Sequence, residues 1–231
     1  MKTIGLIGGM SWVSSAEYYR LINERVKEKL GGLHSAQSVM YSVDFEELEQ
    51  LQHQEKWDEI TALAVDLARR LEQAGAGLIV ICANTMHKAA DDVQAAINIP
   101  LIHIADATAA RVQAAGIKRV GLLGTRFTME DTFYAGRLME KHGLDVLVPN
   151  ERQRRLIHSV IYDELCLEVV REESKRPFIE IIDELSSRGA EGVILGCTEI
   201  PLLVKQTDIQ VRLFDTTRIH AEAAVDYSLS N

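Results

Sequence analysis

The amino-acid sequence predicts an α/β protein made of two similar halves, each built around a parallel sheet. Residues 192–195 form a short run that is rich in β-formers and apolar on both faces, which is typical of a parallel strand covered by helices on both sides. The chain also repeats itself. Residues 73–85 and 187–198 share one pattern, in which a helix ends near a glycine and four apolar residues lead to a small polar tip. Residues 2–9 and 118–125 form a second repeat, so a duplicated unit is expected.

The first half should open with a strand that leads into a helix over residues 14–30, where apolar residues recur at every third and fourth position. A second helical region is expected from 45 to 72, and its charged residues belong to a solvated face. The strands expected in this half cover residues 3–8, 38–43, 78–82 and 100–105.

The second half should repeat the same order of elements. Its expected strands cover residues 119–123, 145–148 and 192–195, and the pattern of residues 100–108 recurs at 211–217. Its expected helices run over about 129–142, 158–169 and 177–187. We therefore expect a first α/β domain made of residues 1–104 plus 208–231 and a second made of residues 105–207.

Composition narrows the class of protein. The 231 residues are 47% hydrophobic and 26% charged, which is ordinary for a globular protein, and the net charge of −9 argues against a nucleic-acid or anionic-membrane partner. The cysteines, Cys82, Cys166 and Cys197, lack paired spacing, so no disulfide framework is expected and the compartment should be reducing. No signal peptide or membrane span is expected either, which makes the cytoplasm the expected location.

Cys197 is the candidate around which the site is predicted. It follows the strand at 192–195 after a single glycine, and the carboxyl ends of parallel strands line the ligand crevice of open α/β sheets. A thiol there suits a nucleophile or an acid/base, although a buried structural cysteine is the alternative. Two matching tips in duplicated halves suit a reaction on both faces of one carbon, such as racemisation at an α-carbon that bears a carboxylate. This chemistry requires no metal ion or cofactor.

Five motifs resemble one family in order along nearly the whole chain. They are Gly-Leu-Ile-Gly-Gly-Met-Ser-Trp12, Leu-His34-Ser-Ala, Asn-Thr-Met-His-Lys88, Leu-Leu-Gly-Thr125-Arg-Phe-Thr-Met and Gly-Cys-Thr-Glu-Ile200. The chain resembles the aspartate/glutamate racemase family of cofactor-independent amino-acid racemases, and is most similar to its bacterial L-specific members. The resemblance implies two flavodoxin-like domains with the site in the cleft between them. It also implies a cytoplasmic homodimeric isomerase, independent of PLP, that acts on aspartate or glutamate.

One departure from the family concerns the first tip. Typical members carry a cysteine before the Asn-Thr pair and L-specific relatives carry a threonine, but Ala83 stands there in this chain. Cys82 lies one residue earlier and should point to the other face of its strand. Cys197 matches the family's second cysteine, which serves the L-isomer. We therefore predict catalysis by Cys197, with Ala83 at a second-base position that lacks a base, and impaired racemisation.

The resemblance also implies a set of substrate-binding residues. They are Met10, Gln52, Asn84, Thr85, Thr125, Thr128, Thr198 and Glu199. Some have plain alternatives, since Met10 could fill the core, Gln52 could be an exposed polar residue and Thr125 could cap a helix. His87 and Lys88 are candidates for a nearby positive charge or for an outer helix face, and His103 is expected to be a core histidine.

Two rival functions remain open from the sequence. A single cysteine in the second half is also the arrangement of the arylmalonate-decarboxylase-like branch of the same superfamily. A non-catalytic protein that binds amino acids is the other rival. The choice between aspartate and glutamate depends on one methylene, and such differences in pocket depth have small effects on binding.

Overall fold

The structure is a computed structural model that describes residues 1–230. The chain forms two compact units, residues 1–103 with 220–230 and residues 104–219. The first boundary lies within one residue of the expected one. The second lies at 219/220 and not at 207/208, because strand β7 (Arg212–Asp215) pairs with β6 (Gly192–Gly196) of the second unit.

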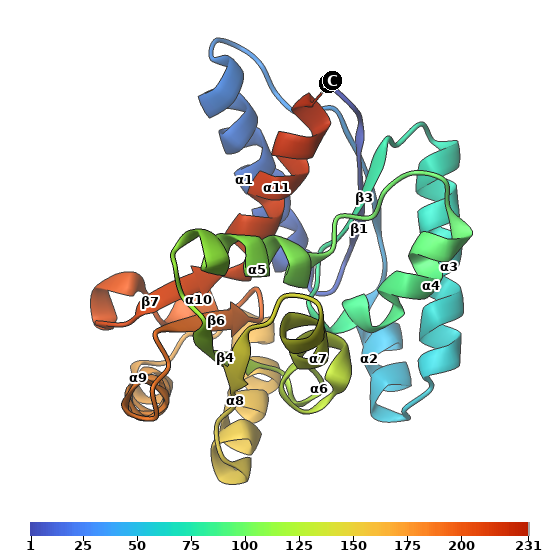
Figure 1. Cartoon of the computed structure of the whole chain (residues 1–231). Helices are drawn as coiled ribbons and strands as arrows, with labels where there is room; N and C mark the ends of the chain where they lie inside the picture. The colour runs from blue at the N-terminus through green and yellow to red at the C-terminus, as the bar shows by residue number, and fades with distance from the viewer. Residues whose placement is uncertain (231) are drawn as a thin grey trace. The chain divides into compact units, whose positions relative to one another are not determined.

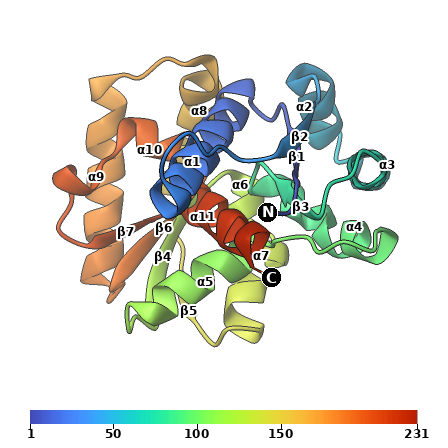
Figure 2. The ribbon, with the colours of Figure 1, turned by 90° about the horizontal axis from the view of Figure 1, so that it is seen from above.

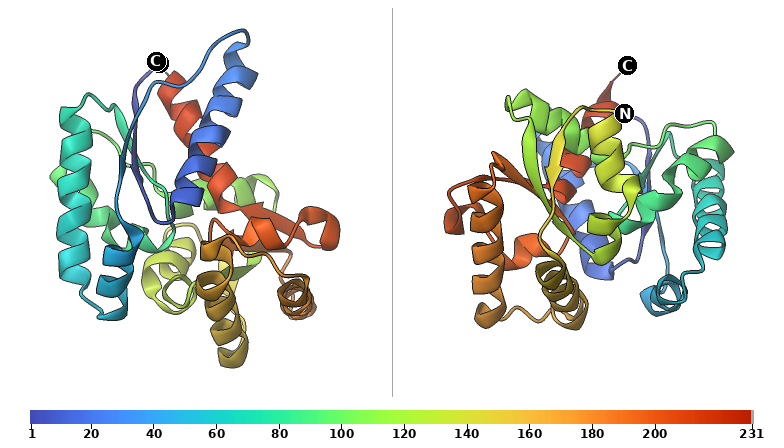
Figure 3. Two further views of the ribbon diagram at one scale, coloured as in Figure 1. Left: turned by 180° about the vertical axis from the view of Figure 1, so that it is seen from behind. Right: turned by 60° about the horizontal axis from the view of Figure 1, so that its bottom comes forward.

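The first unit contains a parallel sheet in the order β2-β1-β3 among the described residues (Figures 1 and 3). Its strands are β1 (Ile4–Gly8), β2 (Ser38–Ser42) and β3 (Leu78–Ile81). Alternate side chains of β1 and β3 enter two separate clusters, as expected for strands buried on both faces. Ile7 and Ile81 pack with α3 (Trp57–Gln73), whereas Leu6 and Val80 pack with α1 (Trp12–Leu30) and α11 (Thr216–Leu229). The remaining helical elements of this unit are α2 (Phe45–His53), η1 (Thr85–Ala89) and α4 (Ala90–Ala96).

The strand expected at residues 100–105 is wrong. Leu101 forms only an isolated bridge with Ile79, and helix α5 (Ile104–Ala114) begins before a strand can extend. Asp106 lies in the first turn of this helix and binds the guanidinium of Arg137, with Nε to Oδ1 at 2.7 Å and Nη2 to Oδ2 at 2.9 Å.

The second unit repeats the architecture with one strand more, in the order β5-β4-β6-β7 among the described residues (Figure 2). The strand order 2-1-3 is common to both units and is the flavodoxin-like one, so the prediction of two α/β domains with parallel sheets is confirmed. Helices α8 and α9 cover one face of the sheet, and α5 and α7 cover the other. The other elements of the second unit, with their residue ranges, are β4 (Arg119–Gly124), α6 (Arg126–Glu130), α7 (Thr132–Glu140), β5 (Asp145–Leu147), α8 (Glu151–Asp163), η2 (Leu165–Leu167), α9 (Glu172–Ser187), α10 (Ile200–Leu203) and η3 (Gln206–Asp208).

Glycines bring the ends of β4 and β6 together. Gly124 and Gly196 are register partners in the parallel pair, and a Cβ atom on Gly124 would lie 2.8 Å from the carbonyl oxygen of Gly196. A side chain at either position would force the backbones apart. Thr125 and Cys197 directly follow these glycines, so the strand register brings two predicted site residues to one edge of the sheet.

The described residues include no helix that is long and apolar enough to cross a membrane.

His220 lies wholly buried in the first unit, between two hydrogen-bond partners. Its Nε2 lies 2.6 Å from the carbonyl oxygen of Ile102, and its Nδ1 lies 2.8 Å from the hydroxyl of Tyr18. Because a carbonyl only accepts, Nε2 carries the hydrogen and Nδ1 accepts from the tyrosine. Burial lowers the pKa of His220 from 6.5 to about 4, so the ring is neutral at physiological pH.

Acid should therefore destabilise the protein through His220. Below about pH 6.5 the unfolded chain gains a proton at this ring, whereas the folded protein does so only near pH 4. The free energy of unfolding should fall as the pH falls across this window, by about 3 kcal/mol from this group. Urea unfolding at a series of pH values measures the slope. His220→Gln should flatten it, because glutamine does not titrate, while the exposed control His34→Gln should leave it unchanged. Equal slopes in the wild type and His220→Gln would contradict this assignment.

Candidate functional site

The first predicted tip, Ala83 to Thr85, begins two residues after the last residue of β3 in the first unit. Ala83 is 9% exposed and packs in the cluster that contains Ile81, whereas Cys82 is fully buried in the cluster on the other face of the sheet. Successive side chains therefore still point to opposite faces of the sheet at Cys82 and Ala83, beyond the end of the strand. Burial raises the pKa of the Cys82 thiol, which makes this cysteine an inert core residue.

Two further predicted residues lie in the same unit. Met10 follows β1, is buried, and shares a cluster with Ala83. Gln52 belongs to helix α2 and is only 2% exposed, so the alternative of an exposed polar residue is wrong for it. Buried glutamine is uncommon and requires polar partners, so Gln52 does not belong to a solvated helix face.

His87 also lies inside the first unit and not on an outer helix face. It is 2% exposed, and its Nδ1 lies 2.8 Å from the carbonyl oxygen of Ala83. The neighbouring Lys88 places its ammonium 4.1 Å from the centre of the Trp57 ring, a cation–π contact. His103, as expected, is a buried histidine, and its ring lies 4.8 Å from that of His87.

The second predicted tip, Cys197 to Glu199, follows β6 in the second unit. Both Cys197 and Glu199 are buried, with exposed fractions of 7% and 3%. The thiol of Cys197 donates a hydrogen bond to Glu199 Oε2 over 2.9 Å, and the hydroxyl of Thr198 donates to the same oxygen over 2.6 Å. Three consecutive side chains therefore form one polar group around a single carboxylate oxygen.

This arrangement determines the protonation state of the thiol. Burial raises the pKa of Cys197 well above its ordinary value, and the negative charge of Glu199 raises it further. Cys166 in η2 lies near enough to both groups to add a smaller effect, and burial raises its own pKa as well. At rest, Cys197 is a thiol whose proton points at a carboxylate that can accept it.

Thr125 and Thr128 follow β4, the strand next to β6, at the same end of the sheet as Cys197. Thr125 is the N-cap of α6, and its hydroxyl accepts from the backbone N–H of Thr128 over 3.3 Å. The two hydroxyl oxygens also lie 3.3 Å apart. The methyl group of Thr128 packs where a Cβ atom on Gly196 would lie, next to Cys197 in the chain. Thr125 thus has the capping role that the sequence left open, and this role does not prevent its hydroxyl from donating to a ligand.

The structure divides the predicted residues equally between the two units. Met10, Gln52, Ala83, Asn84 and Thr85 belong to the first unit, and Thr125, Thr128, Cys197, Thr198 and Glu199 belong to the second. Sequence reasoning missed the bond from His87 to Ala83 and the proximity of Cys166. The spacing of four residues between Ala83 and His87, over one short helical turn, was the available signal for the first.

Replacing Glu199 with glutamine should lower the pKa of Cys197. The substitution removes the negative charge and keeps the shape, and a neighbouring charge typically moves a pKa by about one unit or more. We expect the thiolate fraction at neutral pH, and with it the rate of alkylation by iodoacetamide, to rise about tenfold. Peptide mass spectrometry across a pH series gives the rate at Cys197 alone. Glu180→Gln, an exposed change on α9, is the matched control, and an unmoved pH profile in Glu199→Gln would refute the coupling.

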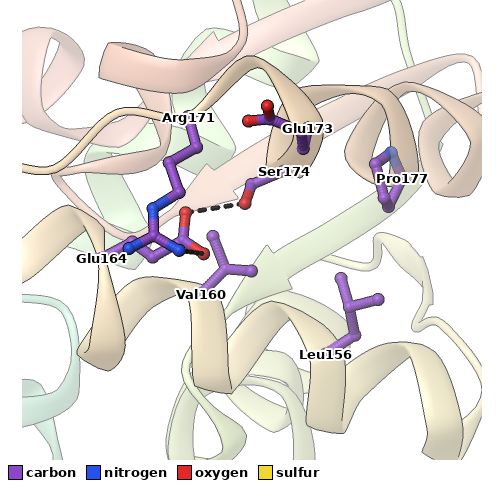
Figure 4. Close-up of a pocket in the computed structure, with 7 residues that line it drawn as sticks. All are labelled: Leu156, Val160, Glu164, Arg171, Glu173, Ser174 and Pro177. Carbon is purple, nitrogen blue, oxygen red and sulfur yellow. Dashed lines mark hydrogen bonds and ion pairs between the residues drawn. The ribbon is translucent and has the colours of Figure 1, made fainter.

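Two cavities of the second unit are lined by residues other than the predicted site residues. One of about 620 Å³ lies between α8 and α9 (Figure 4), with the Glu164 carboxylate accepting from the hydroxyl of Ser174 over 2.6 Å. Another of about 430 Å³ is lined by arginines, glutamates and His158. Neither contains a predicted site residue, so the chemistry of Cys197 is separate from both.

The part of the chain that the structure describes holds no group of three or more His, Cys, Asp or Glu side chains placed to bind a metal ion.

Three relatives show what this chain is similar to. A crystal structure of a candidate Asp/Glu racemase from Yersinia pestis is 53% identical, covers 100% of both chains and superposes with a TM-score of 0.93. An aspartate racemase homologue from Pyrococcus horikoshii is 37% identical, again over 100% of both chains, with a TM-score of 0.87. A broad-specificity amino-acid racemase of Bacillus subtilis is 21% identical over 173 residues, which are 75% of this chain and 74% of that protein.

The family model described as Asp/Glu/Hydantoin racemase matches residues 7–224, nearly the whole chain and both tips. The resemblance read from the five motifs is thereby confirmed, and with it the prediction that the chain is an enzyme of a racemase family. The chain belongs to the Asp/Glu/Hydantoin racemase family.

Proposed function

We propose that this chain removes the α-proton of aspartate or glutamate with Cys197, without a cofactor, and that Ala83 makes it a poor catalyst of full inversion. The observation that carries the proposal is the buried hydrogen bond from the Cys197 thiol to Glu199. It supplies a sulfur base together with a place for the sulfur's own proton.

The proton balance of this step can be written from the two side chains. The thiol proton passes to the Glu199 carboxylate, and the resulting thiolate takes the α-proton, so that one C–H bond breaks and a new S–H bond forms. The electron pair of the broken bond remains on the substrate as an enediolate. A carboxylate 2.9 Å from the sulfur supports this transfer because the donor and the acceptor already lie within hydrogen-bonding distance.

The developing negative charge requires donors that are already in place. Asn84, Thr85 and Thr198 carry such donors at the two strand tips, and we assign them to the substrate carboxylates. Thr125 and Thr128 are assigned the same role on the second unit, where their hydroxyls lie beside the β6 tip. Met10 and Gln52 complete the proposed set on the first unit.

Inversion needs a second proton donor on the opposite face of the α-carbon, and we assign that position to residue 83. Alanine carries no proton to give. The enediolate therefore recovers a proton mainly from Cys197, on the face it left, and isotope exchange outpaces inversion. The loss of a general acid or base typically costs about 10²–10⁴-fold in rate.

The test is incubation of each isomer in heavy water, with isotope and chirality followed together. L-Aspartate or L-glutamate should acquire α-deuterium faster than the D-isomer appears. The D-isomer, which presents its proton to the face of residue 83, should exchange much more slowly. Equal exchange from both isomers would overturn the one-base assignment.

Binding gives a simpler measurement of the substrate class. Aspartate or glutamate at millimolar concentration should raise the midpoint of thermal unfolding, because a ligand that binds only the folded state stabilises it by mass action. If neither amino acid protects the protein while an unrelated ligand does, the proposed substrate class is wrong. Tight binding without α-proton exchange would favour the non-catalytic binding protein.

A single-cysteine decarboxylase is the second candidate, and the combination of Ala83 with Cys197 is the observation that favours it. In that reaction the cysteine delivers a proton to the carbon that has lost carbon dioxide. Release of carbon dioxide from a disubstituted malonate, with no α-proton exchange on amino acids, would establish the decarboxylase instead.

The resemblance also supports a cytoplasmic homodimer. Sedimentation equilibrium of the full chain tests this proposal, with a mass twice that of the 25.8 kDa monomer as the expected result.

A further inference from the structure

Three buried histidine rings lie together behind the first strand tip. The ring centre of His87 lies 4.8 Å from that of His103 and 5.4 Å from that of His220. Their exposed fractions are 2%, 7% and 0%. These residues come from three different segments of the first unit, namely η1, the loop after Leu101, and α11. These tilted and edge-on ring contacts link the tip to the core of its own unit.

Hydrogen bonds join His87 to the first tip and join its neighbour His220 to the core. His87 Nδ1 lies 2.8 Å from the carbonyl oxygen of Ala83, and since a carbonyl only accepts, Nδ1 carries the hydrogen. His220 donates in the same way to Ile102, and Tyr18 of α1 donates to His220. His87 thus contacts the tip on one side and a ring anchored in the core on the other.

The carbonyl that His87 holds belongs to a peptide group at the end of the sheet. The strand β3 ends at Ile81, and the N–H of Cys82 donates to the carbonyl of Ile7 over 2.9 Å. Beyond that bond, His87 supplies the carbonyl of Ala83 with a partner. Because the peptide group is planar, fixing this carbonyl also fixes the direction of the Asn84 N–H, which points the opposite way in a trans peptide.

We propose that His87 is a positioning residue, which fixes the main chain at residue 83 and so directs both the side chain at the second-base position and the N–H of Asn84. The inference rests on the proposed function, because it assigns His87 to the same site. The bond is made to main-chain atoms, so it should be retained when Ala83 is replaced by cysteine.

Two substitutions at position 87 separate the hydrogen bond from the bulk of the ring. In His87→Asn the side-chain amide nitrogen occupies the place of Nδ1 and can still donate to the carbonyl of residue 83. In His87→Gln the amide lies one bond further out, at the place of Nε2, and the donor at the δ position is lost. His103→Gln is the control at a neighbouring ring, since it alters the ring contact of His87 and leaves the bond from His87 to Ala83 in place.

The activity test uses these variants in the Ala83→Cys protein and measures the ratio of inversion to exchange. A displacement of about 1 Å can cost about 10²-fold in rate, so we expect His87→Gln to lower the ratio by about that factor. His87→Asn should retain most of it, and His103→Gln should leave it unchanged. A ratio that is unchanged in His87→Gln, or that falls equally in His103→Gln, would overturn the proposal.

A second readout does not depend on activity. Ala83–Asn84 is the only Ala–Asn step in the chain, so labelling alanine carbonyls with ¹³C and asparagine nitrogens with ¹⁵N yields a single HNCO cross-peak, from this peptide. In the wild-type protein, His87→Gln should move the carbonyl resonance upfield, and His87→Asn should keep it near its native position. If it does not move in His87→Gln, the bond is absent and the proposal fails. If the bond is seen but no variant exchanges or inverts any substrate, the proposed function fails instead.

Discussion

Replacing Cys197 with serine should abolish exchange of the substrate α-proton. A serine hydroxyl is a far weaker acid than a thiol, so the proposed proton transfer to Glu199 should no longer occur at neutral pH. The expected loss is about 10²–10⁴-fold in the rate at which L-aspartate or L-glutamate gains deuterium. Proton NMR of the α-position in heavy water measures this rate directly.

The matched control for this experiment is Cys82→Ala. It removes a thiol buried in the first unit, in the hydrophobic cluster on the face of the sheet that Ala83 does not contact. The free energy of unfolding should fall by an amount typical of a small core deletion, and exchange of the α-proton should continue. Exchange that persists in Cys197→Ser would remove Cys197 from the reaction. Loss of exchange in both variants would point to unfolding, which circular dichroism detects.

Introducing a thiol at the other tip should have the opposite effect. In Ala83→Cys the first unit carries a proton donor at the position assigned to the second base, and the rate of inversion should rise by about 10²–10⁴-fold. Exchange from the D-isomer should appear at the same time, because the new thiol removes the proton that the D-isomer presents. Chiral chromatography of samples taken from heavy water gives both quantities.

A serine at position 83 tests whether the effect of Ala83→Cys comes from acid–base chemistry or only from a more polar side chain. Ala83→Ser has nearly the size of the cysteine variant and adds a hydroxyl, but it lacks a group that ionises near neutral pH. We expect it to bind substrate as well as Ala83→Cys and to invert it much more slowly. Similar inversion in the two variants would mean that a bound water and not residue 83 delivers the proton.

The fold was largely predictable from the sequence because the strands buried on both faces are continuous apolar runs. Continuous apolar runs ending at glycine indicate parallel strands covered on both faces, and the repeat of that pattern indicated two units. The strand expected at residues 100–105 failed because short apolar runs do not distinguish a strand from the first turn of a buried helix. The domain boundary at 208 failed because pairing between β6 and β7 is not encoded locally.

The sequence placed the candidate residues at the ends of two strands, but it did not show the electrostatics around them. Gly-Cys-Thr-Glu and Asn-Thr identify the tips, whereas the direction of the Cys197 thiol toward Glu199 depends on backbone angles that the sequence does not display. The same holds for His87, which the sequence left as a positive charge near the site or a residue of an outer helix face, and which is a buried donor to Ala83. Hydrogen bonds between near neighbours on irregular backbone are the part that sequence patterns leave undetermined.

The glycine pair at the ends of β4 and β6 has a consequence for how this protein can diverge. Gly124 and Gly196 leave no space for a side chain, so substitutions there disturb the backbone of the second unit. Residue 83, by contrast, is held through its carbonyl, and its side chain contributes little to that hold. On the proposed assignment of the second base to residue 83, a change at this one codon would give or remove the ability to invert a stereocentre, while the two glycines that hold the second unit's strand ends remain in place.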